Sequence, residues 1–383
     1  MKGRQMRFLT LLAALVGSLA VAQVSCRNAD KPTGKTLRLG SILDMTGVGA
    51  SYGKRMREGF QLALSDAHSS MANRGFSPEW LVEDFQWDTG KALTAYRKLI
   101  SVDGVKVMVG ITGSRNAKPV AEASKTDDVV IIDALTSSPT LTRQGGPNYF
   151  RVMASDAFAG RFNAYWASSS GMRRSAIMYV EDEWGVSYRD ELKRYLAKAG
   201  NVLVLDQGAP VGSRDYRPQV ARIKQFGADT VFLLLYPPDG GAFMQQARQV
   251  GLTPTVYGSD NLSAPEFAAP GAKVVDGVRL ALPAAVAGPA YDAFRKKYSE
   301  RYHEEADTIA AKSYDAMAVA IDAVLRVGDR PNDIRRLLKS PDYSFQGLSG
   351  RIEFDSNGDL KTQDYTKMVY AGRKLIPFER PGQ

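Results

Sequence analysis

Cysteine and histidine are nearly absent from this chain of 383 residues. It contains one cysteine, Cys26, and two histidines, His68 and His303. A single cysteine excludes an internal disulfide bond. With only two histidines, the sequence does not favour histidine-based acid–base catalysis or a histidine-rich metal site. The dinucleotide-binding pattern G-x-G-x-x-G is also missing. The composition therefore does not favour an enzyme, a metal site or a bound cofactor.

The sequence also lacks a basic run. Its 50 Lys and Arg residues and 41 Asp and Glu residues give a formal charge of +9, and three of the basic residues precede residue 26. The remaining excess is spread along the chain, whereas a nucleic-acid-binding domain gathers its basic residues on one face or along one helix. The charge pattern does not indicate a nucleic-acid partner.

The N-terminal residues have the pattern of an export signal. Lys2, Arg4 and Arg7 precede an apolar stretch, residues 8–22, which is too short to span a bilayer stably. We therefore expect residues 1–25 to be a signal peptide and residues 26–35 a linker. This predicts an exported protein, in the periplasm or on the outer face of the membrane.

Two processing routes are open at the end of this signal. Cleavage after the A-x-A site that ends at Ala22 would release a soluble chain. Alternatively, Cys26 resembles the acylated cysteine of a bacterial lipobox, although Gln23 replaces the usual leucine. Because a lone thiol in an exported chain needs a reason, we favour Cys26 as a lipid-attachment residue.

Apolar strand patterns alternate with helical patterns in two series. The expected strands are 36–42, 80–84, 105–109 and 129–133 in the first series, then 174–180, 202–206, 229–236, 253–258 and 277–282 in the second. Strands separated by helices indicate parallel sheets with crossover helices, so two series predict two α/β lobes. Helices at 289–302, 307–327 and 333–339 follow, then strands at 347–354 and 366–370. The "DSNGDL" stretch (355–360) is expected to be an Asn-Gly turn rather than a calcium loop.

Hydroxyl groups gather after two strands of the first series. Ser114 follows one strand, and Thr136 and Ser137 follow the next, at "DALTSSPTLT" (133–142). Ligands of open α/β sheets lie at the carboxyl ends of strands, and the free N–H groups of a helix start attract anions. These three residues could therefore bind one carboxylate, or they could only cap helices, with Ser138 as the N-cap and Pro139 after it.

Three strands of the second series end near an acidic or aromatic residue. Asp260 follows one strand and would suit an ammonium group, or it could cap the next turn. Tyr236 ends another strand. Trp184 lies where a strand turns into a helix, and its ring could cover a ligand or close the core.

Eight segments in collinear order now carry a resemblance to a known family. They are "GASYGKRMREGFQLAL" (49–64), "VEDFQWDTGKALTAYRKLI" (82–100), "VKVMVGITGS" (105–114), "SSPTLT" (137–142), "DYRPQVARIKQFGADTVFL" (215–233), "QQARQVGL" (245–252), "SYDAMAVAIDAV" (313–324) and "GLSGRIEFDSNGD" (347–359). The chain resembles the leucine/isoleucine/valine-binding protein family, the type I periplasmic binding proteins that serve ABC importers. This resemblance implies two Rossmann-like lobes with parallel central sheets and a three-crossover hinge. The limits we expect are 36–153 plus 284–346 for lobe 1 and 154–283 plus 347–383 for lobe 2.

The resemblance also implies roles for the candidate residues. Ser114, Thr136 and Ser137 match positions that hold an α-carboxylate, and Asp260 matches the acid that holds an α-ammonium. Tyr52, Trp184 and Tyr236 match aromatic residues at the cleft.

We therefore expect a solute receptor for an amino acid, branched-chain or otherwise apolar, that closes by hinge motion. Its partner would be a membrane permease, and the receptor would be a monomer without a cofactor. The alternatives are a receptor for an amide, a urea or an aromatic acid, and a ligand sensor of the same fold.

Overall fold

The computed structural model describes residues 34–284 and 288–379. The expected signal peptide and Cys26 lie outside the described residues. Among the helices of the described part, none is both long enough and apolar enough to cross a membrane.

The first sheet has five parallel strands in the order β2-β1-β3-β4-β5. Their bounds are β1 Lys35–Leu43, β2 Phe76–Asp84, β3 Val107–Ile111, β4 Val130–Asp133 and β5 Tyr149–Arg151. Every residue of β3, β4 and β5 is buried, as continuous apolar runs in a parallel sheet require. The sheet is therefore a central layer that needs helices on both faces.

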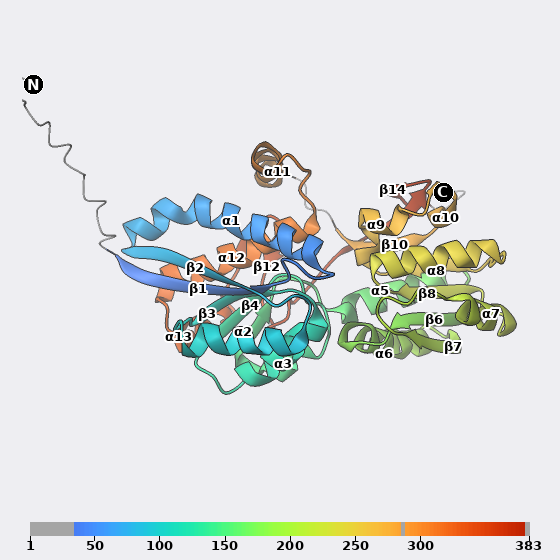
Figure 1. The fold of residues 1–383 in the computed structure, drawn as a ribbon, viewed down its shortest axis with the longest axis horizontal. Helices are drawn as coiled ribbons and strands as arrows, with labels where there is room; N and C mark the ends of the chain where they lie inside the picture. The colour runs from blue at the N-terminus through green and yellow to red at the C-terminus, as the bar shows by residue number, and fades with distance from the viewer. Residues whose placement is uncertain (1–33, 285–287, 380–383) are drawn as a thin grey trace, which may run out of the picture. The chain divides into compact units, whose positions relative to one another are not determined.

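Two pairs of helices cover these faces (Figure 1). The helix α1, Ala50–Asn73, packs beside α12, Thr308–Val327, in one apolar cluster with strand residues such as Leu39. On the other face, α2, Thr89–Ser101, and α3, Ser114–Ser124, pack in a separate cluster. The sequence gives α2 a defined start, because the Asp88 carboxylate accepts a hydrogen bond from the Lys91 N–H at 2.8 Å.

The second sheet has seven strands in the order β14-β13-β10-β9-β8-β6-β7. Their bounds are β6 Arg174–Val180, β7 Val202–Ala209, β8 Thr230–Leu234, β9 Thr255–Gly258, β10 Arg279–Pro283, β13 Tyr365–Ala371 and β14 Lys374–Pro377. The strands β6 to β10 pair in parallel, and the last two strands pair antiparallel. The sequence prediction of two α/β lobes with parallel sheets is confirmed.

Four longer helices surround the second sheet. They are α5 Asp156–Ser169, α6 Glu183–Lys198, α7 Arg217–Gln225 and α8 Pro237–Gln249. Figure 1 shows α6 and α8 on opposite sides of its strands. The short elements η2 Asp260–Ser263, α9 Pro265–Ala268 and α10 Ala272–Val275 follow β9. One apolar cluster contains the sheet and its helices.

The remaining helices and short elements belong with the first sheet. They are α4 Leu141–Gly145, η1 Gly146–Asn148, α11 Pro289–Tyr302, α13 Pro331–Leu338 and the hairpin β11 Phe345–Gly347 with β12 Gly350–Ile352. The segment 347–360, which was expected in the second lobe, has Ile352, Phe354 and Leu360 in the first apolar cluster. Three apolar side chains in one core place this segment with the first sheet, so the chain leaves that core after Leu360.

The stretch "DSNGDL" forms a turn, as the Asn-Gly pair suggested. Asp355 accepts hydrogen bonds from the N–H groups of Asn357 at 2.8 Å and Asp359 at 3.0 Å. Gly358 has φ +93°, and a Cβ there would lie 2.2 Å from the Tyr149 carbonyl oxygen. Only glycine fits both the backbone conformation and the space, so this turn packs directly on β5.

Candidate functional site

A cavity of about 580 Å³ is lined by residues from both lobes. Six of the seven side chains that the sequence singled out for ligand contact line it. They are Tyr52, Ser114, Ser137, Trp184, Tyr236 and Asp260. Its apolar lining includes Trp87, Leu135, Met153, Leu282 and Pro283. The cavity combines an apolar wall with a few polar groups, which is the usual character of a small-molecule site.

Ser114 and Ser137 meet as expected from neighbouring parallel strands. Ser114 is the first residue of α3, after Gly113 with φ +83°. Its Oγ accepts hydrogen bonds from the N–H groups of Ser137 and Ser138, both at 3.3 Å. The ends of β3 and β4 thus bring a hydroxyl group, a loop and a helix start to one edge of the cavity.

The Thr136 side chain does not reach the cavity. It is 1% exposed, and its hydroxyl lies 2.7 Å from Asp133 Oδ2 and 3.0 Å from the Tyr149 hydroxyl. Tyr149 also donates a hydrogen bond to Asp133. This hydroxyl therefore satisfies a buried carboxylate at the end of β4.

Ser138 is not the cap of the next helix. The helix α4 begins at Leu141, after Thr140. Instead, Ser138 Oγ contacts α6: it lies 3.1 Å from Glu183 Oε1 and 2.9 Å from Ser187 Oγ. The third hydroxyl of the "TSSP" stretch, that of Ser138, thus joins the two lobes.

Asp156, which the sequence did not single out, is a buried acid directly behind the cavity lining. It begins α5 and is 3% exposed. Its Oδ2 accepts a hydrogen bond from Ser137 Oγ at 2.8 Å. Burial, with a smaller contribution from the nearby charge of Asp260, raises the pKa of Asp156 to about 8. The signal was the pair Ser155-Asp156 at the break between the two series, where Ser155 caps the helix.

Asp260 supplies a second acid. It begins η2, and its carboxylate accepts a hydrogen bond from the Asn261 N–H at 2.9 Å. Burial raises the pKa of Asp260 as well. Two carboxyl groups that lose hydration and repel each other disfavour the ionised state unless a cation lies between them.

Three aromatic rings form one wall of the cavity. Tyr236 stacks on Trp184 with ring centroids 5.2 Å apart, and the Trp87 ring meets Tyr236 edge-on at 6.0 Å. The Tyr236 hydroxyl donates to Asp182 at 2.8 Å, which fixes the ring. Trp184 is 6% exposed and also contacts Tyr188. Trp184 therefore lines the cavity and closes the core at once.

Charged groups lie at the Tyr52 end of the cavity. Arg55 lies 2.8 Å from Asp307 and 3.7 Å from Glu266 of α9. The Arg55 guanidinium is 6.0 Å from the centre of the Tyr52 ring. The second of these ion pairs joins helices from different lobes.

Arg151, which the sequence did not single out, binds the backbone of the loop that carries Ser137. It is fully buried in β5, and its Nε lies 2.6 Å from Asp359 Oδ1. Its Nη1 donates to the Ser138 carbonyl at 2.6 Å and to the Thr136 carbonyl at 3.4 Å. With their carbonyl groups bound to Arg151, the residues of this loop present their N–H groups to Ser114.

Comparison with known proteins agrees with this architecture. The family model described as "Periplasmic binding protein" matches residues 36–372. The leucine-, isoleucine-, valine-, threonine- and alanine-binding protein of Pseudomonas aeruginosa is 24% identical over 366 residues, which is 95% of this chain and 96% of that protein.

Two solved structures share the fold. The leucine-binding protein LivK of Thermotoga maritima is 24% identical, with a TM-score of 0.80 over 90% of this chain and 98% of that one. A solute-binding protein of Rhodopseudomonas palustris, in complex with 3,4-dihydroxybenzoic acid, is 21% identical, with a TM-score of 0.77 over 90% of this chain and 96% of that one. With a family model matching most of its length, this chain belongs to the periplasmic binding protein family, the solute receptors of ABC transporters.

Proposed function

We propose that this protein is an exported receptor that binds one α-amino acid in the cavity and delivers it to the permease of an ABC importer. The observation that carries the proposal is a pair of acids, the half-buried Asp260 that lines the cavity and the buried Asp156 that binds Ser137 behind the lining, beside a cavity edge built from Ser114 and Ser137. A ligand with both an ammonium and a carboxylate group complements this arrangement, the ammonium facing the acids and the carboxylate facing the serine edge.

The carboxylate would bind at the start of α3. The first N–H groups of a helix have no partner within it, and their dipoles favour an anion. Ser114 Oγ lies at the same edge, where it accepts a hydrogen bond from the Ser137 N–H at 3.3 Å, and its own hydroxyl would donate to the ligand carboxylate. A charge-assisted hydrogen bond there contributes about 1.5–3 kcal/mol to binding. Thr136 is not part of this proposal, because its hydroxyl is engaged with Asp133.

The ammonium would lie near Asp260 and Asp156. These carboxyl groups gain a partner for their ionised state only when a cation binds. The stacked rings of Tyr236 and Trp184 add an electron-rich surface.

Hinge closure would form this site from two lobes. The limits that we propose are 36–153 with 288–360 for the first lobe and 154–284 with 361–379 for the second, since the apolar clusters divide there. Attachment to the membrane through Cys26 and a monomeric state remain parts of the same proposal.

A ligand panel tests the function. Wild type and Asp260→Asn would be screened by thermal shift against amino acids, their amides and aromatic acids, with Asp190→Asn, an exposed acid of α6, as the control. A ligand present at about 100 times its Kd adds roughly 2.7 kcal/mol to the free energy of unfolding. We expect this shift with an amino acid in wild type and in the control, and its loss in Asp260→Asn. No shift with any amino acid would refute the proposal.

An aromatic acid is the second candidate ligand. The aromatic wall favours it, and the neighbour from Rhodopseudomonas palustris holds such an acid. However, an aromatic acid would bring a negative charge beside the carboxyl groups of Asp156 and Asp260 without neutralising them. In the panel, stabilisation by aromatic acids that persists in Asp260→Asn would identify this alternative.

A further inference from the structure

We propose that Trp87 is a specificity-determining residue, whose indole ring limits the size of the ligand side chain. This inference rests on the proposed function. Trp87 lies between β2 and α2 and lines the cavity beside Gly113 and Ser114. Trp87 thus lies between Ser114, where the ligand carboxylate would bind, and the ring of Tyr236. The side chain of a bound amino acid would lie beside its indole ring.

The indole ring packs directly against the backbone of two glycines, Gly49 and Gly113. A Cβ on Gly49 would lie 2.2 Å from Trp87 Cζ3, and a Cβ on Gly113 would lie 2.9 Å from Trp87 Cη2. Real Cβ atoms do not approach other atoms so closely, so any other residue at these positions would displace the ring. One edge of the indole is therefore fixed against the backbone of the first lobe.

The backbone that carries the ring has an unusual conformation. Gln86 has φ +55° and Trp87 has φ +57°, in the left-handed region that side chains disfavour. The Asp84 carboxylate holds this turn, because its Oδ1 accepts hydrogen bonds from the N–H groups of Met45 and Gln86, both at 3.0 Å. Such strain persists where surrounding contacts impose it, and it is concentrated at binding sites.

Packing rather than hydrogen bonding holds the indole. Its Nε1 is buried and has no hydrogen-bond partner among the described residues. Buried tryptophans usually pair this group. The ring is therefore held at the cavity by its packing contacts.

The ring also meets the second lobe. Trp87 contacts Tyr236 edge-on at 6.0 Å, and Tyr236 stacks on Trp184. Phe85 stacks on Trp87 at 6.3 Å from the core side of the first lobe. With neighbours on both sides, the indole cannot move aside for a larger ligand, so it excludes side chains that need its volume.

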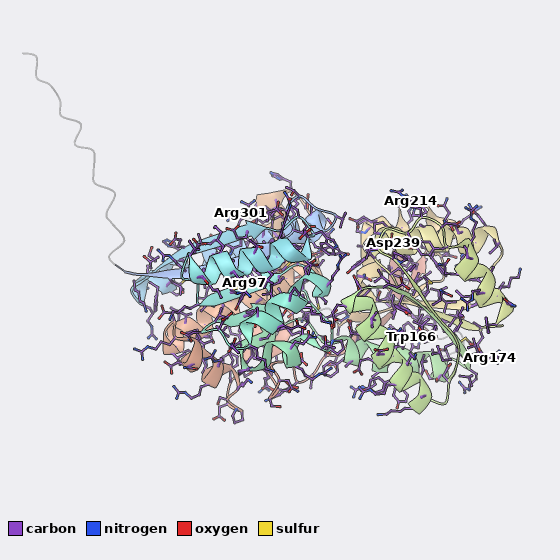
Figure 2. The ribbon with its side chains drawn as sticks, turned by 60° about the horizontal axis from the view of Figure 1, so that its bottom comes forward. Arg97, Trp166, Arg174, Arg214, Asp239 and Arg301 are labelled. Atoms are coloured by element: carbon purple, nitrogen blue, oxygen red, sulfur yellow. The ribbon has the colours of Figure 1, made fainter. Side chains whose placement is uncertain are left out.

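The test compares ligand preferences by calorimetry. Wild type, Trp87→Ala and Trp87→Phe would be titrated with alanine, valine, leucine, phenylalanine and tryptophan. Trp166→Phe is the control, because Trp166 lies in the second lobe (Figure 2) and is not among the residues that line the cavity. We expect Trp87→Ala to shift the affinity ratio at least tenfold in favour of phenylalanine or tryptophan, Trp87→Phe to shift it less, and Trp166→Phe to leave it unchanged.

Unchanged ratios in Trp87→Ala, with wild type binding amino acids, would overturn the role of Trp87 while leaving the proposed function intact. If Trp87→Ala does not fold, the ratio in Trp87→Phe decides in the same way. If wild type binds no amino acid, the proposed function has failed, which the wild-type titrations reveal before any variant is compared.

Discussion

The Asp156 carboxyl group holds its proton up to a pH of about 8, whereas an unfolded chain releases it near pH 4. The folded state then binds more protons between these values, so the free energy of unfolding of the unliganded protein falls as the pH rises from about 4 to about 8. A ligand ammonium favours the ionised carboxylate. Amino-acid binding at pH 7 should therefore release a proton.

Calorimetry in two buffers of different ionisation enthalpy measures this release. We expect the binding enthalpy of wild type to depend on the buffer and that of Asp156→Asn to depend on it less, since Asp260 also has a raised pKa. Equal enthalpies in both buffers for wild type would show that no proton leaves Asp156.

Single residues also mark the limit of sequence-based prediction. The carboxyl ends of strands identified Ser114, Ser137, Tyr236 and Asp260 as residues that line the cavity. The same rule gave Thr136, whose side chain faces Asp133 instead. The direction of a hydroxyl after a strand depends on the partners that the fold brings near it, and Tyr149 and Asp133 come from two different strands.

At the scale of elements, β5 holds the loop of residues 136–138 through Arg151. Replacing Arg151 by methionine leaves the Asp359 carboxylate half-buried without its partner and frees two carbonyl groups of the loop. Breaking a buried ion pair costs about 3 kcal/mol of the free energy of unfolding. Urea denaturation measures this loss. Arg151→Met with Asp359→Leu should recover part of it, and a single variant within about 0.5 kcal/mol of wild type would contradict the role of the pair.

The sequence did not predict β5, α5 or the true start of β2, and each omission has a physical reason. The strand β5 has only three residues, and α5 is buried along much of its length, with buried polar residues such as Asn163 that obscure a helical stripe. The strand β2 begins at Phe76, four residues before the predicted start, although it contains Pro78. A proline is tolerated there because β2 lies at the edge of its sheet.

At the scale of the whole molecule, Glu183 joins the lobes. From α6 it binds Lys118 of α3 at 2.8 Å, and it accepts hydrogen bonds from Ser138 and Thr140. Contacts that exist only when the lobes are together favour the closed state and hence ligand binding. We expect Glu183→Gln to weaken amino-acid binding by about tenfold, the equivalent of one charge-assisted hydrogen bond. The exposed neighbour Glu181→Gln is the control, and equal affinities in both variants would show that Glu183 does not stabilise closure.

The central claim is that one ligand joins the acids of one lobe to the hydroxyl and N–H groups of the other. The most direct measurement is a calorimetric titration of wild type with an amino acid selected by the panel and with the same acid lacking its amino group. We predict one-to-one binding of the amino acid and at least hundredfold weaker binding of its analogue. Equal binding of the two would show that Asp156 and Asp260 do not recognise an ammonium group.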